Sequence, residues 1–165
     1  MTQINFKGAP IQTEGNFPQI GENAPDFQLV KTDLSVATLS DFVGKQIVFN
    51  IFPSVDTAVC ALQLKTFSQK LAQSEDVILL FASMDLPFAL NRFCGAEGVD
   101  NAVTTSDFRF HSLAEKYGVK MISGPLAGLY ARATLVLNSD HTVVYSELVS
   151  DVVNEPDYDA AMNAL

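Results

Sequence analysis

The hydrophobic positions of this chain fall into nearly continuous apolar runs and into segments with helical spacing. The runs at 46–52 and 77–83 predict two strands, the first of them covered on both faces. Between them, apolar residues recur at helical spacing, which predicts a helix over 57–73. The centre of the chain is therefore expected to form a strand, helix, strand unit.

Shorter elements flank this unit. One hairpin is predicted at the N-terminus, where 4–6 pairs with 11–13 across a Gly/Pro turn. A second is predicted later, where 133–137 pairs with 142–146 across the turn-rich segment 138–141. Further helices are predicted for 87–94 ending at Gly95, 112–117 ending at Gly118, and 156–165 with Pro156 near its first turn. This order is typical of an α/β thioredoxin-like fold, a central mixed β-sheet flanked by helices, here with an added N-terminal hairpin.

Composition narrows the class of protein. A length of 165 residues, of which 48% are hydrophobic, suits one core, so we expect a single domain over 1–165. The net charge of -9 comes from scattered acidic residues, and no basic patch indicates nucleic acid as a partner. The first residues lack a secretory pattern, and the apolar runs fall far below the roughly 20 residues of a membrane span. A cytoplasmic protein without membrane contact is expected.

The two cysteines, Cys60 and Cys94, have two open interpretations. Free cysteine is often a small core residue, but in a reducing compartment a pair of cysteines also suits reactive chemistry. With Thr57 as N-cap, Cys60 is the third helical residue, where unpaired backbone N–H groups and the helix dipole favour a thiolate. However, Cys60 also shares an apolar helix face with Leu64 and Phe67, so helical spacing alone leaves both interpretations open.

The run Pro53-x-x-x-Thr57-x-x-Cys60 resembles the active-site motif of peroxiredoxins, and the wider sequence resembles the bacterial thiol peroxidase branch, whose members are atypical two-cysteine peroxiredoxins. The segments that carry this resemblance extend over nearly the whole chain and are 50–57, 85–89, 92–98, 124–129 and 155–158. One position departs from the pattern: Ala58 stands where this branch commonly has proline. That change leaves the helix start less rigid without removing a reacting group.

The resemblance implies roles for five residues. Cys60 would attack the hydroperoxide, Thr57 would hydrogen-bond to the sulfur and the peroxide, and Pro53 would shield the site from water. Arg132 would stabilise the thiolate and orient the peroxide, although a salt bridge with a carboxylate is its alternative role. Cys94 would form a disulfide with the sulfenic acid of Cys60, after local unwinding of a helix.

The same resemblance implies the partners. Hydrogen peroxide and organic or lipid hydroperoxides would be the substrates, thioredoxin would be the reductant, and the protein would form a homodimer. The chemistry needs no cofactor and no metal.

Three other functions compete with this prediction. A thioredoxin-type oxidoreductase needs Cys-x-x-Cys, whereas this chain has Thr57-x-x-Cys60. A cysteine hydrolase needs a histidine beside Cys60, and only His111 and His141 exist, both expected at the surface or in capping positions. A peroxide sensor would use the same disulfide to signal, and the sequence does not separate it from an enzyme.

Overall fold

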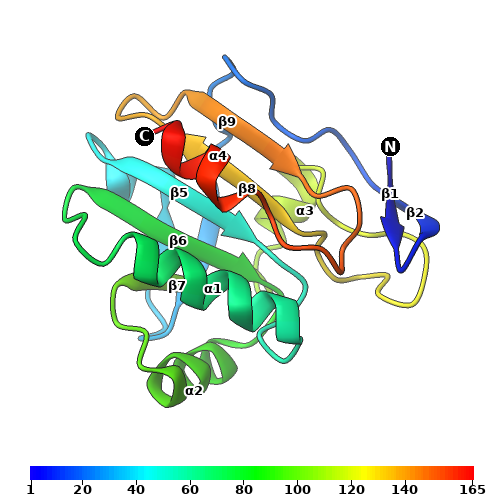
Figure 1. Ribbon diagram of the computed structural model, residues 1–165, viewed down its shortest axis with the longest axis horizontal. Helices are drawn as coiled ribbons and strands as arrows, with labels where there is room; N and C mark the ends of the chain where they lie inside the picture. Colours follow the sequence, from blue (N-terminus) through cyan, green and yellow to red (C-terminus); the bar gives the residue numbers. More distant parts are fainter.

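A mixed seven-stranded sheet forms the centre of the molecule (Figure 1). The structure, a computed structural model, describes residues 1–165. In the order β4-β3-β7-β6-β5-β8-β9, the parallel trio β5, β6 and β7 is flanked by antiparallel neighbours on both sides. The strands are β3 (Gln28–Lys31), β4 (Val36–Thr38), β5 (Gln46–Ile51), β6 (Val77–Ser83), β7 (Ala102–Ser106), β8 (Ala133–Leu137) and β9 (Val143–Leu148).

Helices cover both faces of this sheet (Figure 1). On one face lie α1 (Ala58–Lys70), α2 (Pro87–Glu97) and α4 (Tyr158–Asn163), and on the other lies α3 (Ser112–Lys116). Strand β5 packs into both layers, because Phe49 belongs to the core under α3 and Val48 to the core under α1. A 3-10 helix, η1 (Leu39–Phe42), follows β4, and none of the helices is long and apolar enough to cross a membrane.

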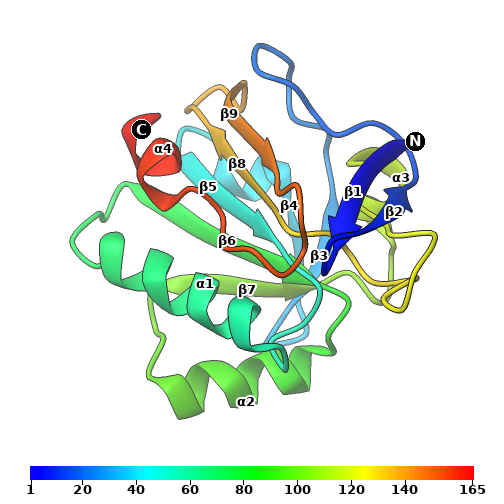
Figure 2. The ribbon, with the colours of Figure 1, turned by 45° about the vertical axis from the view of Figure 1, so that its right-hand side comes forward.

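The predicted N-terminal hairpin is confirmed, and it is tied to the segment after β9 (Figure 2). It consists of β1 (Thr2–Phe6) and β2 (Ala9–Thr13). The backbone of Asn5 donates to Ser150 O at 2.8 Å and accepts from Val152 N at 2.9 Å. The Asp151 carboxylate accepts from the turn amides of Lys7 and Gly8 at 3.1 and 2.8 Å. These bonds fix the hairpin against the same segment that contacts Arg132.

Two helix ends differ from the sequence prediction. Helix α2 continues past Gly95 and ends at Gly98, which adopts the left-handed conformation with φ 67°. A glycine inside a helix only weakens it, whereas a left-handed residue stops it, so Gly98 terminates α2. Helix α4 starts at Tyr158 with Asp157 as N-cap, and Pro156 therefore lies before the helix. The strands β3, β4 and β7 were not predicted as strands.

Candidate active site

Cys60 lies in the first turn of α1, at the carboxyl end of β5. Thr57 is the N-cap with extended backbone angles, and Cys60 is the third helical residue and fully buried. The amides of Ala58, Val59 and Cys60 have no hydrogen-bond acceptor within the protein. The predicted placement of the thiol is therefore confirmed, with three free N–H groups beside it.

Arg132 is the residue immediately before β8, and sheet register brings it to the sulfur. Ile51, the last residue of β5, pairs with Ala133, so Arg132 lies next to the end of β5. Arg132 Nη1 donates to Cys60 Sγ at 3.2 Å, and the side chain is 2% exposed. The guanidinium is thus in direct contact with the sulfur, in the position of a group that stabilises negative charge on it.

The guanidinium is held by neutral acceptors and not by a carboxylate. Its Nε and Nη2 donate to Val152 O at 3.0 and 2.8 Å, and Nη1 also donates to Gln63 Oε1 at 2.9 Å. Arg132 forms no salt bridge, so the alternative role in a structural ion pair is wrong. The positive charge therefore has no anionic partner unless Cys60 is ionised.

A buried polar chain behind Arg132 was missed from the sequence. Gln63 Nε2 donates to Asn50 Oδ1 at 2.8 Å, and Thr134 Oγ1 donates to the same oxygen at 2.9 Å. These contacts orient the Gln63 amide so that its oxygen faces Arg132. A signal existed in the sequence, since Asn50 interrupts an apolar strand and Gln63 follows Cys60 by less than one helical turn.

Thr57 differs in one contact from the expectation. Its hydroxyl donates to Ser54 O at 2.9 Å, and no hydrogen bond joins it to the sulfur of Cys60. With its proton used in this way, Thr57 Oγ1 has only lone pairs to offer to a further partner. The expected contact with the sulfur is thus absent in this conformation.

A cavity of about 400 Å³ gives access to these groups. It is lined by Phe6, Lys7, Pro53, Thr57, Ala58, Val59, Leu126, Arg132, Val152 and Val153. Cys60 is not part of the lining, but Thr57 and Arg132, which lie beside it, are. Pro53, two residues after the end of β5, is buried and belongs to this lining. Most of the lining is apolar, which suits the hydrocarbon part of an organic molecule.

Asp85 links the loop before α1 to the start of α2. Its carboxylate accepts from Ser54 Oγ at 2.7 Å, Val55 N at 2.9 Å and Ser83 Oγ at 2.7 Å. The N-cap of α2, Leu86, follows directly. One side chain therefore positions the loop that leads to Cys60 and the base of the helix that carries Cys94.

Asp85→Asn is expected to lower the free energy of unfolding by about 1–3 kcal/mol, because the three donors lose a charged acceptor. Urea unfolding followed by circular dichroism measures this change. The matched control is Asp100→Asn, an exposed residue whose side chain has no hydrogen bond, with an expected change below about 0.5 kcal/mol. Equal stability of the two variants would contradict a positioning role for Asp85.

Cys94 lies on α2 and does not reach the cavity of Cys60. It is half-buried, its thiol is 3.8 Å from Thr104 Oγ1 on β7, and both cysteines are free. Burial raises the pKa of the Cys94 thiol above its ordinary value of 9.0. The sequence prediction ended this helix at Cys94. Because α2 continues three residues further, Cys94 lies within the helix and not at its end.

Two exposed ion pairs connect α2 to the Cys60 region. Lys65 Nζ lies 2.9 Å from Glu97 Oε2, and Arg92 Nη2 lies 3.8 Å from Asp56 Oδ1. Exposed pairs of this kind contribute at most about 1 kcal/mol each. Movement of α2 relative to α1 is therefore only weakly opposed by these contacts.

The histidines lie away from the sulfur. His111 is exposed at the N-cap of α3. His141 lies in the turn between β8 and β9, and its Nε2 is 2.9 Å from Phe42 O. Neither residue contacts Cys60 or lines its cavity. The Cys–His pair that a cysteine hydrolase requires is therefore not formed.

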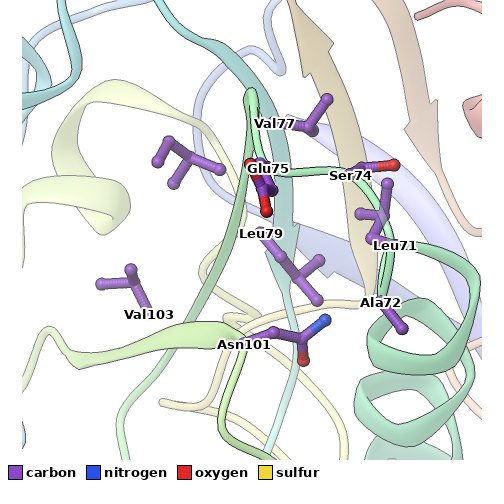
Figure 3. A pocket seen from close by; sticks show the side chains of 9 residues that line it. Leu71, Ala72, Ser74, Glu75, Val77, Leu79, Asn101 and Val103 are labelled. Carbon is purple, nitrogen blue, oxygen red and sulfur yellow. The ribbon is translucent and has the colours of Figure 1, made fainter.

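A second cavity, of about 290 Å³, lies at the opposite end of the parallel strands (Figure 3). It is bounded by the carboxyl end of α1 and the first residues of β6 and β7, including Leu71, Val77 and Val103. Glu75 is its only ionisable lining residue, and no cysteine faces it. The reacting groups therefore favour the cavity beside Cys60.

Comparison with known proteins identifies the family. A match to Redoxin covers residues 19–162, and the chain therefore belongs to the Redoxin family. It is 48% identical over 165 residues to a thiol peroxidase of Mycobacterium bovis, a match that covers 100% of this chain and 99% of the relative.

Two solved structures are also similar. A peroxiredoxin-like protein from Aquifex aeolicus matches with a TM-score of 0.93 and 33% identity, over 100% of this chain and 98% of the other. A thiol peroxidase from Chromobacterium violaceum shares the fold, with a TM-score of 0.90 and 24% identity over 98% of this chain and 93% of the other. The matches confirm the thioredoxin-like fold, the resemblance to bacterial thiol peroxidases, and the assignment to the peroxidase class of oxidoreductases.

Proposed function

We propose that Cys60 is the peroxidatic cysteine of a thiol-dependent peroxidase. The observation that carries this proposal is the Arg132 guanidinium, 3.2 Å from a buried sulfur at a helix N-terminus. The Cys60 thiolate attacks one peroxide oxygen, so that an S–O bond forms and the O–O bond breaks. The leaving oxygen takes the electron pair and a proton and departs as an alcohol or water, and the sulfur is oxidised by two electrons to a sulfenic acid.

The surrounding groups fit the charges of this step. Arg132 stabilises the attacking thiolate. Ala58 and Val59 line the cavity, and their amides, which have no acceptor within the protein, are available to the negative charge that develops on the leaving oxygen. Thr57 Oγ1 accepts the hydroperoxide O–H and orients it. Pro53 keeps bulk water from the sulfur, as the resemblance implies.

Cys94 is the proposed resolving cysteine. Its thiolate attacks the sulfenic sulfur of Cys60, a disulfide forms, and hydroxide leaves and is protonated to water. The two thiols lie on different helices, so α2 has to unwind locally before they meet. Because burial raises the pKa of Cys94, exposure during unwinding lowers this pKa toward 9.0 and increases the thiolate fraction when it is needed.

The resemblance to the family supports thioredoxin as the reductant of the disulfide. A reducing compartment such as the cytoplasm fits two cysteines that are free in the resting protein. A homodimer would bury a patch of exposed apolar side chains near the start of α2, made up of Leu34, Leu86, Phe88 and Phe108. Residues 1–165 act as one domain, since the N-terminal hairpin supplies part of the active-site wall.

The mostly apolar cavity supports organic hydroperoxides as substrates beside hydrogen peroxide. We expect NADPH consumption when the wild-type protein is mixed with thioredoxin, thioredoxin reductase and cumene hydroperoxide. A control without thioredoxin is expected to show only background. If peroxide produces the disulfide but no sustained turnover follows, a peroxide sensor replaces the enzyme as the best interpretation.

A further inference from the structure

We propose that Lys7, in the turn of the N-terminal hairpin, makes the active-site cavity select hydroperoxides that carry an acidic group. This inference rests on the proposed peroxidase function and deepens it by naming the residue that discriminates among organic substrates. It concerns the charge at the far end of the substrate and not the hydroperoxide group itself.

The charge of the cavity lining carries the first part of the argument. Among the lining residues, only Lys7 and Arg132 are ionisable, and both are cations. No carboxylate faces the cavity, although the whole chain has 19 acidic and only 10 basic residues. The charged residues that line this cavity are therefore opposite in sign to the net charge of the chain.

The two cations differ in how many of their N–H donors are already used in hydrogen bonds. Arg132 already donates to Cys60, Gln63 and Val152, which holds it at the reacting sulfur. The Lys7 ammonium takes part in no salt bridge and no hydrogen bond, and it lies 5.5 Å from the ring centroid of Phe6, which lines the same cavity. All its donors are available to a ligand.

The neighbouring carboxylate forms no ion pair with Lys7. Asp151 is directed at the backbone, and it accepts from the amides of Lys7, Gly8 and Val153 at 3.1, 2.8 and 3.2 Å. These bonds hold the Lys7 backbone in its left-handed conformation, with φ 51°. The backbone that presents the ammonium is thus fixed, and the ammonium itself is unpaired.

These features define the chemistry of a complementary ligand. Its hydroperoxide group meets Cys60 and Arg132, an apolar body contacts Phe6 and Val153, and an anionic group pairs with Lys7. A carboxylate at the end of a hydrocarbon chain has this pattern. Because the pair with Lys7 is solvent-accessible, its expected contribution is about fivefold in kcat/KM.

The test compares kcat/KM for a linoleic acid hydroperoxide with that for its methyl ester, both below the concentrations at which they form micelles. For hydroperoxide, kcat/KM reports the steps up to oxidation of Cys60, so thioredoxin does not influence the ratio. We expect the wild type to favour the acid by about fivefold, Lys7→Gln to show a ratio near one, and Lys7→Glu to favour the ester. The wild-type preference is also expected to shrink with added NaCl.

Lys31→Gln is the control, because Lys31 lies on β3 and does not line the cavity. It is expected to keep the wild-type ratio. An acid preference that persists in Lys7→Gln, or no preference in the wild type, would overturn the inference. If cumene hydroperoxide is also not reduced, the proposed function itself fails, so the two failures are distinguishable.

Discussion

Cys60→Ser is expected to lower the rate of hydroperoxide reduction by at least about 1000-fold, because a serine hydroxyl is not ionised at neutral pH and is not oxidised by peroxide.

Cys94→Ser is expected to consume one equivalent of hydroperoxide per chain and then to stop, because the sulfenic acid forms but finds no second thiol. Rapid-mixing experiments without reductant measure the first equivalent, and the coupled assay with thioredoxin measures turnover.

Structural measurements show whether a variant has lost only its reactivity or also its fold. Cys60 is fully buried, so circular dichroism and thermal unfolding are needed to show that Cys60→Ser is folded. Mass spectrometry of Cys94→Ser after one equivalent of hydroperoxide is expected to show oxidation of Cys60 only. Full turnover in Cys60→Ser, or a normal turnover in Cys94→Ser, is incompatible with the proposed pair of roles.

Arg132→Lys is expected to lower kcat/KM for hydroperoxide by about 100-fold to 1000-fold while retaining a positive charge. One ammonium nitrogen cannot reproduce the fork that contacts Cys60, Gln63 and Val152 together. The effect therefore arises from geometry and not from net charge. Stopped-flow measurement of Cys60 oxidation gives the rate directly, without the thioredoxin step.

Arg109→Lys provides the control for this substitution. Arg109 is exposed, forms no salt bridge and lies over the Phe110 ring, and its replacement is expected to change kcat/KM less than twofold. Urea unfolding of both variants shows whether Arg132→Lys remains folded under assay conditions. A rate for Arg132→Lys within about threefold of the wild type would mean that charge alone suffices, and the role assigned to the fork would be wrong.

The sequence by itself determined the features that depend on neighbouring residues. The apolar runs located β5 and β6, the helical spacing located α1, and Thr57 placed Cys60 at the third position of that helix. These predictions succeeded because capping and periodicity act within a few residues. The same locality explains the errors, since Gly95 and Gly98 are both plausible stops for α2 until the packed helix shows which of them is left-handed.

Only the tertiary structure decided what surrounds the sulfur. Arg132 lies 72 positions from Cys60 in the chain, and the antiparallel register of β5 and β8 brings the two side chains together. The Val152 carbonyl reaches Arg132 because the N-terminal hairpin holds its segment in place, and the same hairpin contributes Lys7 to the cavity wall. Such contacts depend on strand register and packing between distant segments, which no local pattern of residues records.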